Sequence, residues 1–203
     1  MLLGLLDPVP QQQGAEQGTV SIDGIPLALI DRQKIRQQLI TIPQDAVFLP
    51  AGSTVAQNLD PAGTATPEQC QAVLTDLGLW EMAQVQGGLD GILTESSLSH
   101  GQRQIFSLAR GVLKRRTTGG AVLLLDEFTS SVDVDTERTM LAAVEREFSG
   151  CTVVMVAHRL DIVAEFCDRV LVINRGSVVE DGDPRLLRRM EDTWFAALLR
   201  ATS

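Results

Sequence analysis

The sequence predicts an α/β fold with a parallel sheet, because apolar strands and helical segments alternate along its 203 residues. Residues 121–125 (AVLLL) are apolar without alternation, which is typical of a strand covered on both faces. Residues 151–157 (CTVVMVA) are β-branched and apolar, and they predict a second buried parallel strand. Parallel strands end at one edge of the sheet, where open α/β folds bind ligands, so we expect Asp126, Glu127 and His158 there.

The other elements are expected on both sides of these strands. Residues 19–27 predict a hairpin with its turn at Asp23-Gly24, and residues 39–42 and 169–174 predict further strands. Helical spacing predicts helices at 34–38, about 67–93, 102–114, 136–148 and 184–199. Two buried stripes are expected, formed by Cys70, Val73, Leu74, Leu77 and Leu79, and by Ile105, Leu108, Ala109, Val112 and Leu113. Trp194 and Phe195 are expected to pack the closing helices onto the core.

The run LSHGQ at residues 98–102 predicts a helix start that can bind an anion. Ser99 and Gln102 have the spacing of a capping box, in which the two side chains satisfy backbone N–H groups of the first turn. The helix end carries partial positive charge, and Gly101 has no side chain to keep a phosphate from the backbone. A plain helix cap without a ligand would use the same residues.

Two carboxylates, Asp126 and Glu127, follow the strand at residues 121–125. A nucleotide bound with Mg²⁺ needs one carboxylate near the metal and another group that orients the attacking water. Adjacent acids at a strand end can supply both functions. Solvated turn residues are the alternative explanation of the pair.

Five short stretches, in the same order and at similar distances, resemble the motifs of the nucleotide-binding domain of an ABC ATPase. Residues 41–45 resemble the Q-loop, 98–102 the signature motif and 123–127 the Walker B strand. Residues 130–133 resemble the D-loop and 156–159 the segment of the switch histidine. The resemblance spans nearly the whole chain. It implies a P-loop NTPase-like parallel sheet core with an α-helical subdomain at about residues 62–112, the remainder of residues 1–203 being RecA-like core.

Flanking residues are similar to the C subfamily of ABC transporters, the multidrug-resistance-associated kind. The similarity lies in PQD at 43–45, FLP at 48–50, Thr54-Val55 and NLDP at 58–61. Glu127 after Asp126, His100 in the signature and the run TSSVD at 129–133 resemble the second nucleotide domain of that subfamily more than the first.

The pattern departs from the family at its start, since the sequence contains no G-x-x-x-x-G-K-[ST] loop to cradle phosphates. The chain has two lysines, Lys34 and Lys114, and neither follows a glycine. Residues 1–8 (MLLGLLDP) resemble the stretch that follows the Walker A helix in the family. We therefore expect a domain truncated before the Walker A motif, and negligible ATPase activity of the chain alone.

The resemblance also implies roles for residues of the chain's own ATP site. Glu127 would be the base or water-orienting group, Asp126 and Gln44 would lie around Mg²⁺, and His158 would contact the γ-phosphate. The signature residues Ser99, Gly101 and Gln102, together with Asp133 of the D-loop, would instead reach the nucleotide held by a partner domain. The implied cofactors are ATP and Mg²⁺, and the implied partners are a second nucleotide-binding domain and transmembrane domains.

Composition narrows the function classes further. The net charge of −9 argues against a broad nucleic-acid-binding face, and no apolar stretch approaches the roughly twenty residues that span a bilayer. Any attachment to the cytoplasmic face of a membrane would come from transmembrane domains outside this sequence, and the chain alone would be soluble. Cys70, Cys151 and Cys167 lack paired metal-ligand spacing and predict buried thiols in a reducing compartment.

Two hypotheses stay open from the sequence. The first is the ATP-binding and hydrolysing domain of an exporter; the second is a non-catalytic module that only presents its signature motif to a partner. A soluble ABC ATPase of DNA repair or translation is a third class, disfavoured by PQD at 43–45, NLDP at 58–61 and the acidic charge. The transported substrate and its direction are not encoded in these residues.

Overall fold

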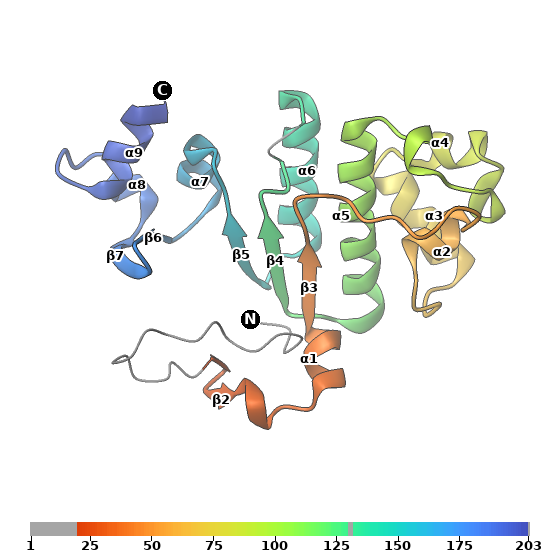
Figure 1. The fold of residues 1–203 in the computed structure, drawn as a ribbon, viewed down its shortest axis with the longest axis horizontal. Coiled ribbons are helices and arrows are strands. Elements are labelled where there is room, and N and C mark those ends of the chain that lie inside the picture. The colour runs from red at the N-terminus through yellow and green to blue at the C-terminus, as the bar shows by residue number, and fades with distance from the viewer. Residues whose placement is uncertain (1–19, 130–131, 203) are drawn as a thin grey trace. The chain divides into compact units, whose positions relative to one another are not determined.

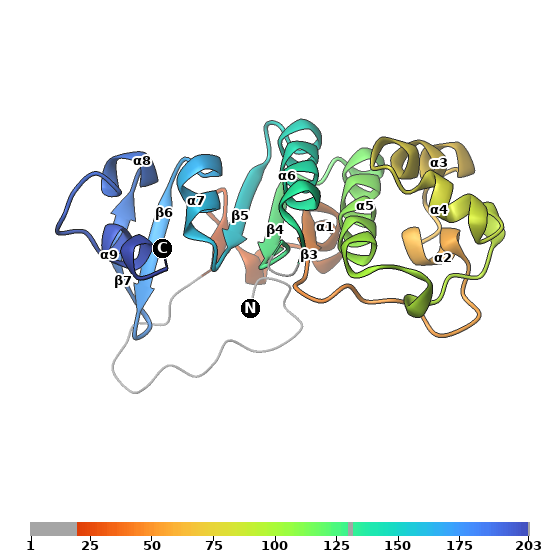
Figure 2. The same ribbon diagram turned by 90° about the horizontal axis from the view of Figure 1, so that it is seen from above.

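The structure is a computed structural model that describes residues 20–129 and 132–202. The chain divides into two compact units, Met1–Met155 and Val156–Ser203, and each is described by itself. Figures 1 and 2 draw the elements of both. The division after Met155 was not predicted from the sequence. Residues 1–8, which resemble the stretch that follows the Walker A helix, lie outside the described residues.

A parallel sheet forms the centre of the first unit. Strands β3 (Leu39–Ile42), β4 (Val122–Asp126) and β5 (Thr152–Val156) follow one another in the order β3-β4-β5. β3 and β4 pair in parallel from Leu39 opposite Val122 to Ile42 opposite Leu125. This confirms the predicted α/β fold with a parallel core.

The burial of the strands differs from the prediction in one respect. In β4, Leu123 and Leu125 are fully buried, whereas Val122 and Leu124 are half-buried. In β5, Val154 and Val156 are 48% and 57% exposed, so the prediction of a second buried strand was wrong. Among the described residues, β5 is the last strand of this sheet, and an edge strand has neighbours on one side only. The apolar residues of β5 predict a strand correctly, but they do not show whether other elements bury it.

Helices and a short hairpin complete the first unit. The hairpin consists of β1 (Ser21–Ile22) and β2 (Ile25–Pro26), with left-handed Asp23 and Gly24 at its turn as predicted. The α-helices are α1 (Arg32–Gln38), α2 (Val55–Leu59), α3 (Pro67–Asp76), α4 (Trp80–Val85), α5 (His100–Thr118) and α6 (Val134–Glu147). Single 3-10 turns lie at Leu27–Leu29, Gly88–Asp90 and Glu95–Ser97.

The segment predicted as helical at about 67–93 contains α3, α4 and the 3-10 turn Gly88–Asp90. Gly78 adopts a left-handed φ of 70° between the two α-helices, and a residue without a Cβ reaches this conformation at little cost. All five predicted stripe residues from Cys70 to Leu79 are buried. The stripe of α5 is buried as well, except for the half-buried Ile105.

The second unit is a small α/β arrangement of its own. It contains α7 (Leu160–Phe166), the antiparallel pair β6 (Val170–Asn174) and β7 (Ser177–Gly182), α8 (Pro184–Leu187) and α9 (Trp194–Thr202). Phe195 is fully buried, as predicted, but Trp194 is 50% exposed, so only one of the two aromatic residues packs inward. The carboxylate of Glu180 accepts the backbone N–H groups of both, which caps the start of α9.

Candidate functional site

The predicted capping box at the start of α5 is present. The Ser99 hydroxyl accepts the N–H of Gln102 at 3.2 Å, and the Gln102 side-chain oxygen accepts the N–H of Ser99 at 2.9 Å. Both residues therefore fix the first turn of a 19-residue helix. His100, the first helical residue, is exposed.

Gly101 of the signature lies against the residues that follow the D-loop. A Cβ placed on Gly101 would lie 3.6 Å from the Thr136 side chain, an ordinary contact, so packing within the chain does not demand glycine here. The Thr136 hydroxyl donates to Asp133 Oδ2 at 2.7 Å, and Asp133 Oδ1 accepts the N–H groups of Asp135 and Thr136. Thr136 thereby connects the signature turn with the D-loop acid.

Asp133 caps α6 with its carboxylate. Its pKa is lowered, first by the backbone N–H of Thr136 and then by the Thr136 hydroxyl, because both donate to the charged form. The predicted D-loop residues 130 and 131 lie outside the described residues.

The acidic pair lies at the carboxyl end of β4. Ile42 pairs with Leu125, so Gln44 and Glu127 each lie two residues beyond this last pair of the neighbouring parallel strands β3 and β4. Glu127 has a left-handed φ of 45°, an unfavourable conformation for a residue with a side chain. Leu125, two residues before Glu127, and Phe128, directly after it, are each 1% exposed, so the chain is buried on either side of the turn formed by Asp126 and Glu127. The fold thus stabilises a strained backbone at the residue predicted to orient water.

Gln44 is exposed, and its backbone is held by a residue that sequence reasoning missed. Gln104 Nε2 donates to the main-chain oxygen of Gln44 at 2.7 Å, although the two residues lie 60 positions apart. Gln104 itself is 4% exposed. A glutamine on the buried side of a predicted amphipathic helix was the available signal, because buried amides need hydrogen-bond partners.

Arg110, two turns further along α5, holds the segment after the Q-loop. It donates to the main-chain oxygens of Val47 and Asn58, and its guanidinium lies 5.1 Å from the Phe48 ring centroid. Burial lowers the pKa of Arg110 to about 10. Asn58, which is fully buried, accepts the N–H of Leu49 at 2.9 Å. Residues 47–49 are therefore fixed by side chains of α2 and α5.

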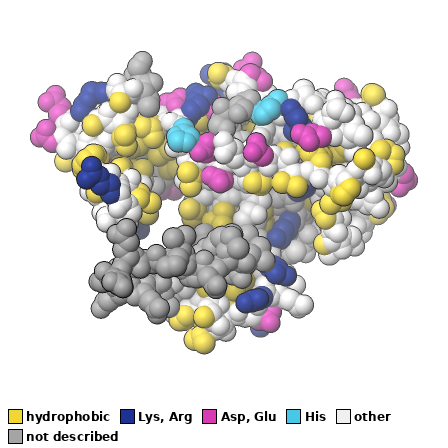
Figure 3. Space-filling view, viewed as in Figure 1, with side chains coloured by type: hydrophobic (Ala, Val, Ile, Leu, Met, Phe, Trp, Pro, Cys, Tyr) yellow, Lys and Arg dark blue, Asp and Glu magenta, His cyan; other side chains and the backbone are white. Residues whose placement is uncertain are grey.

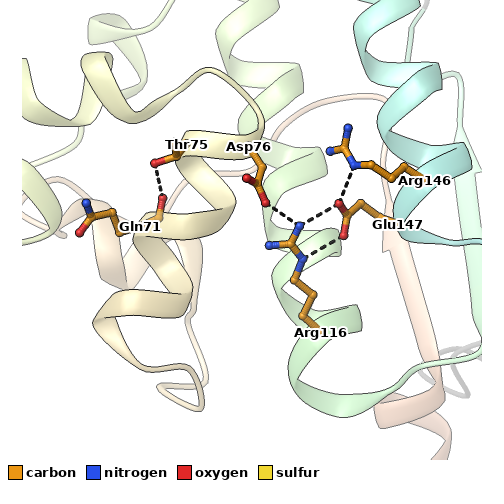
Figure 4. Close-up of polar contacts among 6 residues, drawn as sticks. All are labelled: Gln71, Thr75, Asp76, Arg116, Arg146 and Glu147. Atoms are coloured by element: carbon orange, nitrogen blue, oxygen red, sulfur yellow. Dashed lines mark hydrogen bonds and ion pairs between the residues drawn. The ribbon is translucent and has the colours of Figure 1, made fainter.

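The carboxyl-terminal end of α5 carries an ion-pair network that connects three helices (Figure 4). Arg116 contacts Asp76 of α3 at 2.7 Å and Glu147 of α6 at 2.8 Å, and Arg146 lies 3.0 Å from the same Glu147 carboxylate. The Arg116 hydrogen bond is the main cause that lowers the pKa of Glu147. This network is remote in sequence from every predicted site residue.

His158 belongs to the second unit, two residues after β5 ends, and it is exposed. The neighbouring Arg159 forms an ion pair with Asp161 at 2.8 Å. The predicted approach of His158 to the γ-phosphate stays a prediction.

The residues at the strand ends suit Mg²⁺ by their chemistry. Asp126 is an exposed carboxylate and Gln44 carries an amide oxygen, and Mg²⁺ commonly takes one or two protein oxygens together with water and phosphate oxygens. Within the described ranges, no group of three or more His, Cys, Asp or Glu residues forms a metal site of its own. The donor set fits a metal that arrives with a nucleotide rather than one held by protein ligands alone.

The surface charge agrees with the acidic composition. On the face drawn in Figure 3, Lys and Arg side chains lie in separate small groups among acidic ones, without a continuous basic stripe. In the part of the chain that the structure describes, no helix is long and apolar enough to cross a membrane.

Comparisons with known proteins agree with the motifs and the sheet. The family described as ABC transporter matches residues 1–130. ABC transporter FGM5 of Gibberella zeae is 45% identical over 98% of this chain and 14% of its own length. ABC-type transporter braE of Annulohypoxylon truncatum is 46% identical over 98% of this chain and 14% of its own length.

Among solved structures, a bacterial Atm1-family ABC exporter with ATP bound superposes with a TM-score of 0.82 at 26% identity. The match covers 100% of this chain and 33% of that one. The chain has the P-loop NTPase fold of ABC ATPase domains, and it belongs to the ABC transporter family. It spans about one seventh of the length of the first two fungal relatives, 14% in each case.

Proposed function

We propose that this chain belongs to the second ATP-binding domain of a C-subfamily ABC exporter. It would couple ATP hydrolysis to solute transport at the cytoplasmic face of a membrane. The observation that carries the proposal is the turn after β4, where Glu127 adopts a φ of 45° between the exposed Asp126 and the buried Phe128. Strained backbone of this kind clusters at functional sites.

The proposed chemistry is in-line attack of water on the γ-phosphate. Glu127 accepts a proton from the water or orients it, and Gln44 lies at the end of the neighbouring strand. Mg²⁺, when bound with ATP, neutralises charge on the β- and γ-phosphates, and Asp126 and Gln44 are the residues that would hold it. His158 is proposed to donate a hydrogen bond to the γ-phosphate.

Ser99, Gly101, Gln102 and Asp133 are proposed to serve the nucleotide of a partner domain. The capping box fixes the first turn of α5, and Asp133 accepts the hydroxyl of Thr136, whose side chain lies beside Gly101 of that turn. A preformed helix end needs no rearrangement when an anion approaches. Closure of two such domains is a ligand-driven population shift that would drive the transmembrane domains between two access states.

The second candidate is a non-catalytic module that presents its signature to a partner and hydrolyses nothing. It is favoured by one sequence observation: neither Lys34 nor Lys114 follows a glycine, so no phosphate-binding loop is present in these residues. Both candidates use the same signature face. The two candidates differ in whether Glu127 contacts a bound nucleotide.

The test compares Mg-ATP binding and hydrolysis by the 203-residue chain and by a longer polypeptide that supplies the glycine-rich loop upstream. Only the longer polypeptide is expected to bind and turn over ATP. In it, Glu127→Gln should lower kcat by at least about 100-fold while binding is kept, because it removes the general base. The matched control Glu145→Gln changes an exposed glutamate of α6 and should leave kcat unchanged.

Hydrolysis by the short chain that Glu127→Gln stops would overturn the expected need for the upstream loop. Full turnover of the longer polypeptide with Glu127→Gln would overturn the role of Glu127. A longer polypeptide that binds ATP without turnover would favour the non-catalytic module.

A further inference from the structure

Gln104 is a buried amide that connects two predicted site segments. Its side chain is 4% exposed, and its Nε2 donates to the Gln44 main-chain oxygen at 2.7 Å. Within the described residues, its Oε1 is buried without a hydrogen-bond partner. An unsatisfied buried acceptor is unfavourable, so retention of a polar side chain here needs a reason beyond packing.

Helix α5 provides a rigid support for this contact. Gly111 lets α5 approach β3 closely, since a Cβ there would lie 3.2 Å from Ile42 Cδ1 and 3.4 Å from Ile40 Cγ2. Lys114 Nζ also donates to the Leu39 main-chain oxygen at 2.9 Å. The chain leaves this packed strand at Ile42, and its next fixed point in the Q-loop is the bond from Gln104 to Gln44.

The position of Gln104 along α5 also matters. Ser99, the cap of the helix, lies five residues before Gln104, which is less than two helical turns. Arg103, the neighbour of Gln104, pairs with Glu95 of the preceding 3-10 turn and so does not reach the Q-loop. Gln104 therefore gives a short connection from the signature turn to the Q-loop backbone.

We propose that Gln104 is a positioning residue that makes the Q-loop and the signature turn move together. The inference rests on the proposed function, in which the Q-loop serves the chain's own nucleotide and the signature serves the partner's. A bond inside one chain would then couple the two ATP sites of the pair. Coupling of this kind requires an element with two arrangements, and the unsatisfied Oε1 gives the amide a second bond to form when the Q-loop shifts.

The first test uses the 203-residue chain without nucleotide and measures backbone order parameters by NMR relaxation. Gln104→Leu keeps burial and similar volume but removes the hydrogen bond to the Gln44 main-chain oxygen. It should lower the order parameters of residues 44–48 from about 0.85 to below about 0.6, while those within residues 105–115 stay as in the wild type. Ser107→Ala, a buried polar-to-apolar change in the same helix, is the control and should leave residues 44–48 unchanged.

Gln104→Met, which has nearly the shape of glutamine, replaces the leucine variant if that variant does not fold. Unchanged order parameters at residues 44–48 in the folded variant would overturn the mechanical connection.

The second test is a double-mutant cycle in the full-length transporter that contains this chain. Its readout is the protection of amides 44–48 from hydrogen exchange on addition of Mg-ATP. Ser99→Ala should reduce this protection in the wild-type background and should have no further effect in the Gln104→Leu background. Additive effects of the two substitutions would overturn the coupling. If Mg-ATP protects neither 44–48 nor 99–103 in the wild type, the proposed function itself fails, which is a different outcome.

Discussion

The two ends of helix α5 use their side chains in opposite ways. At the carboxyl-terminal end, Arg116 joins α3 and α6, and Lys114 and Thr118 donate to main-chain oxygens of residues 39 and 37. At the amino-terminal end, the bonds of Ser99 and Gln102 stay within the first turn. One end anchors the fold, and the other is preformed for an approaching group. The residues that stabilise the fold and those proposed to recognise a nucleotide therefore lie at opposite ends of a single helix.

The largest effect is expected at the anchored end. Arg116→Met should lower the free energy of unfolding by about 2 kcal/mol, because the mostly buried Glu147 carboxylate loses its main partner. The figure is below that of a fully buried pair, since the Arg116 side chain is 33% exposed and that of Asp76 is 43% exposed. Urea unfolding of the 203-residue chain measures it.

Arg138→Met is the control for this change. Arg138 and Asp135 form an ion pair at 3.6 Å with side chains 76% and 95% exposed, so its loss should cost less than about 0.5 kcal/mol. Equal losses for Arg116→Met and Arg138→Met would show that the carboxyl-terminal end is no anchor.

A smaller effect on stability is expected at the other end. Ser99→Ala removes one half of the capping box and should cost about 1 kcal/mol. Thr66→Ala removes the equivalent half of the capping box of α3 and should cost a similar amount. The two variants differ in function, because only Ser99→Ala is expected to weaken Mg-ATP-dependent turnover in the full-length transporter, by tenfold or more. A similar loss of turnover in both variants would attribute the effect to helix stability alone.

Local signals predicted much of the fold and part of the site. The hairpin turn at Asp23-Gly24 and the capping box of Ser99 and Gln102 depend on neighbours within a few residues, and both are confirmed. The bonds of Gln104 and Arg110 join residues 52 to 63 positions apart, and no local pattern shows which partner a buried polar side chain finds. The left-handed Glu127 has no signal of its own, since glutamate rarely adopts this conformation.

Burial was the weakest prediction, for a physical reason. The apolar residues of β5 indicate a strand correctly, but exposure depends on what covers the strand, and Val154 is 48% exposed at the edge of the sheet. The same limit applies to Trp194, which is apolar and half exposed beside the buried Phe195. The periodicity of apolar residues identifies helices and strands, whereas the burial of a side chain depends on which other parts of the folded chain pack against it.

The smallest expected effect is a pH dependence of stability, which should be present at the carboxyl-terminal end of α5 and absent at its amino-terminal end. The pKa of Glu147 is lowered in the folded chain, first by its hydrogen bond with Arg116, so its contribution to stability is present above the unfolded value of 4.5. It is lost as the pH falls through the lower folded pKa. The stability difference between wild type and Glu147→Gln, expected to be below about 1 kcal/mol, should therefore be present at pH 6 and should shrink as the pH falls below 4.5.

The difference between wild type and Ser99→Ala should not change over the same range, because neither the Ser99 hydroxyl nor the Gln102 amide titrates there. Urea unfolding at a series of pH values measures both differences. A Glu147→Gln difference that does not shrink as the pH falls below 4.5 would mean that packing of the side chain, rather than its charge, holds α5 against α6. The anchored end would then depend on shape, and the contrast between the two ends would no longer be electrostatic.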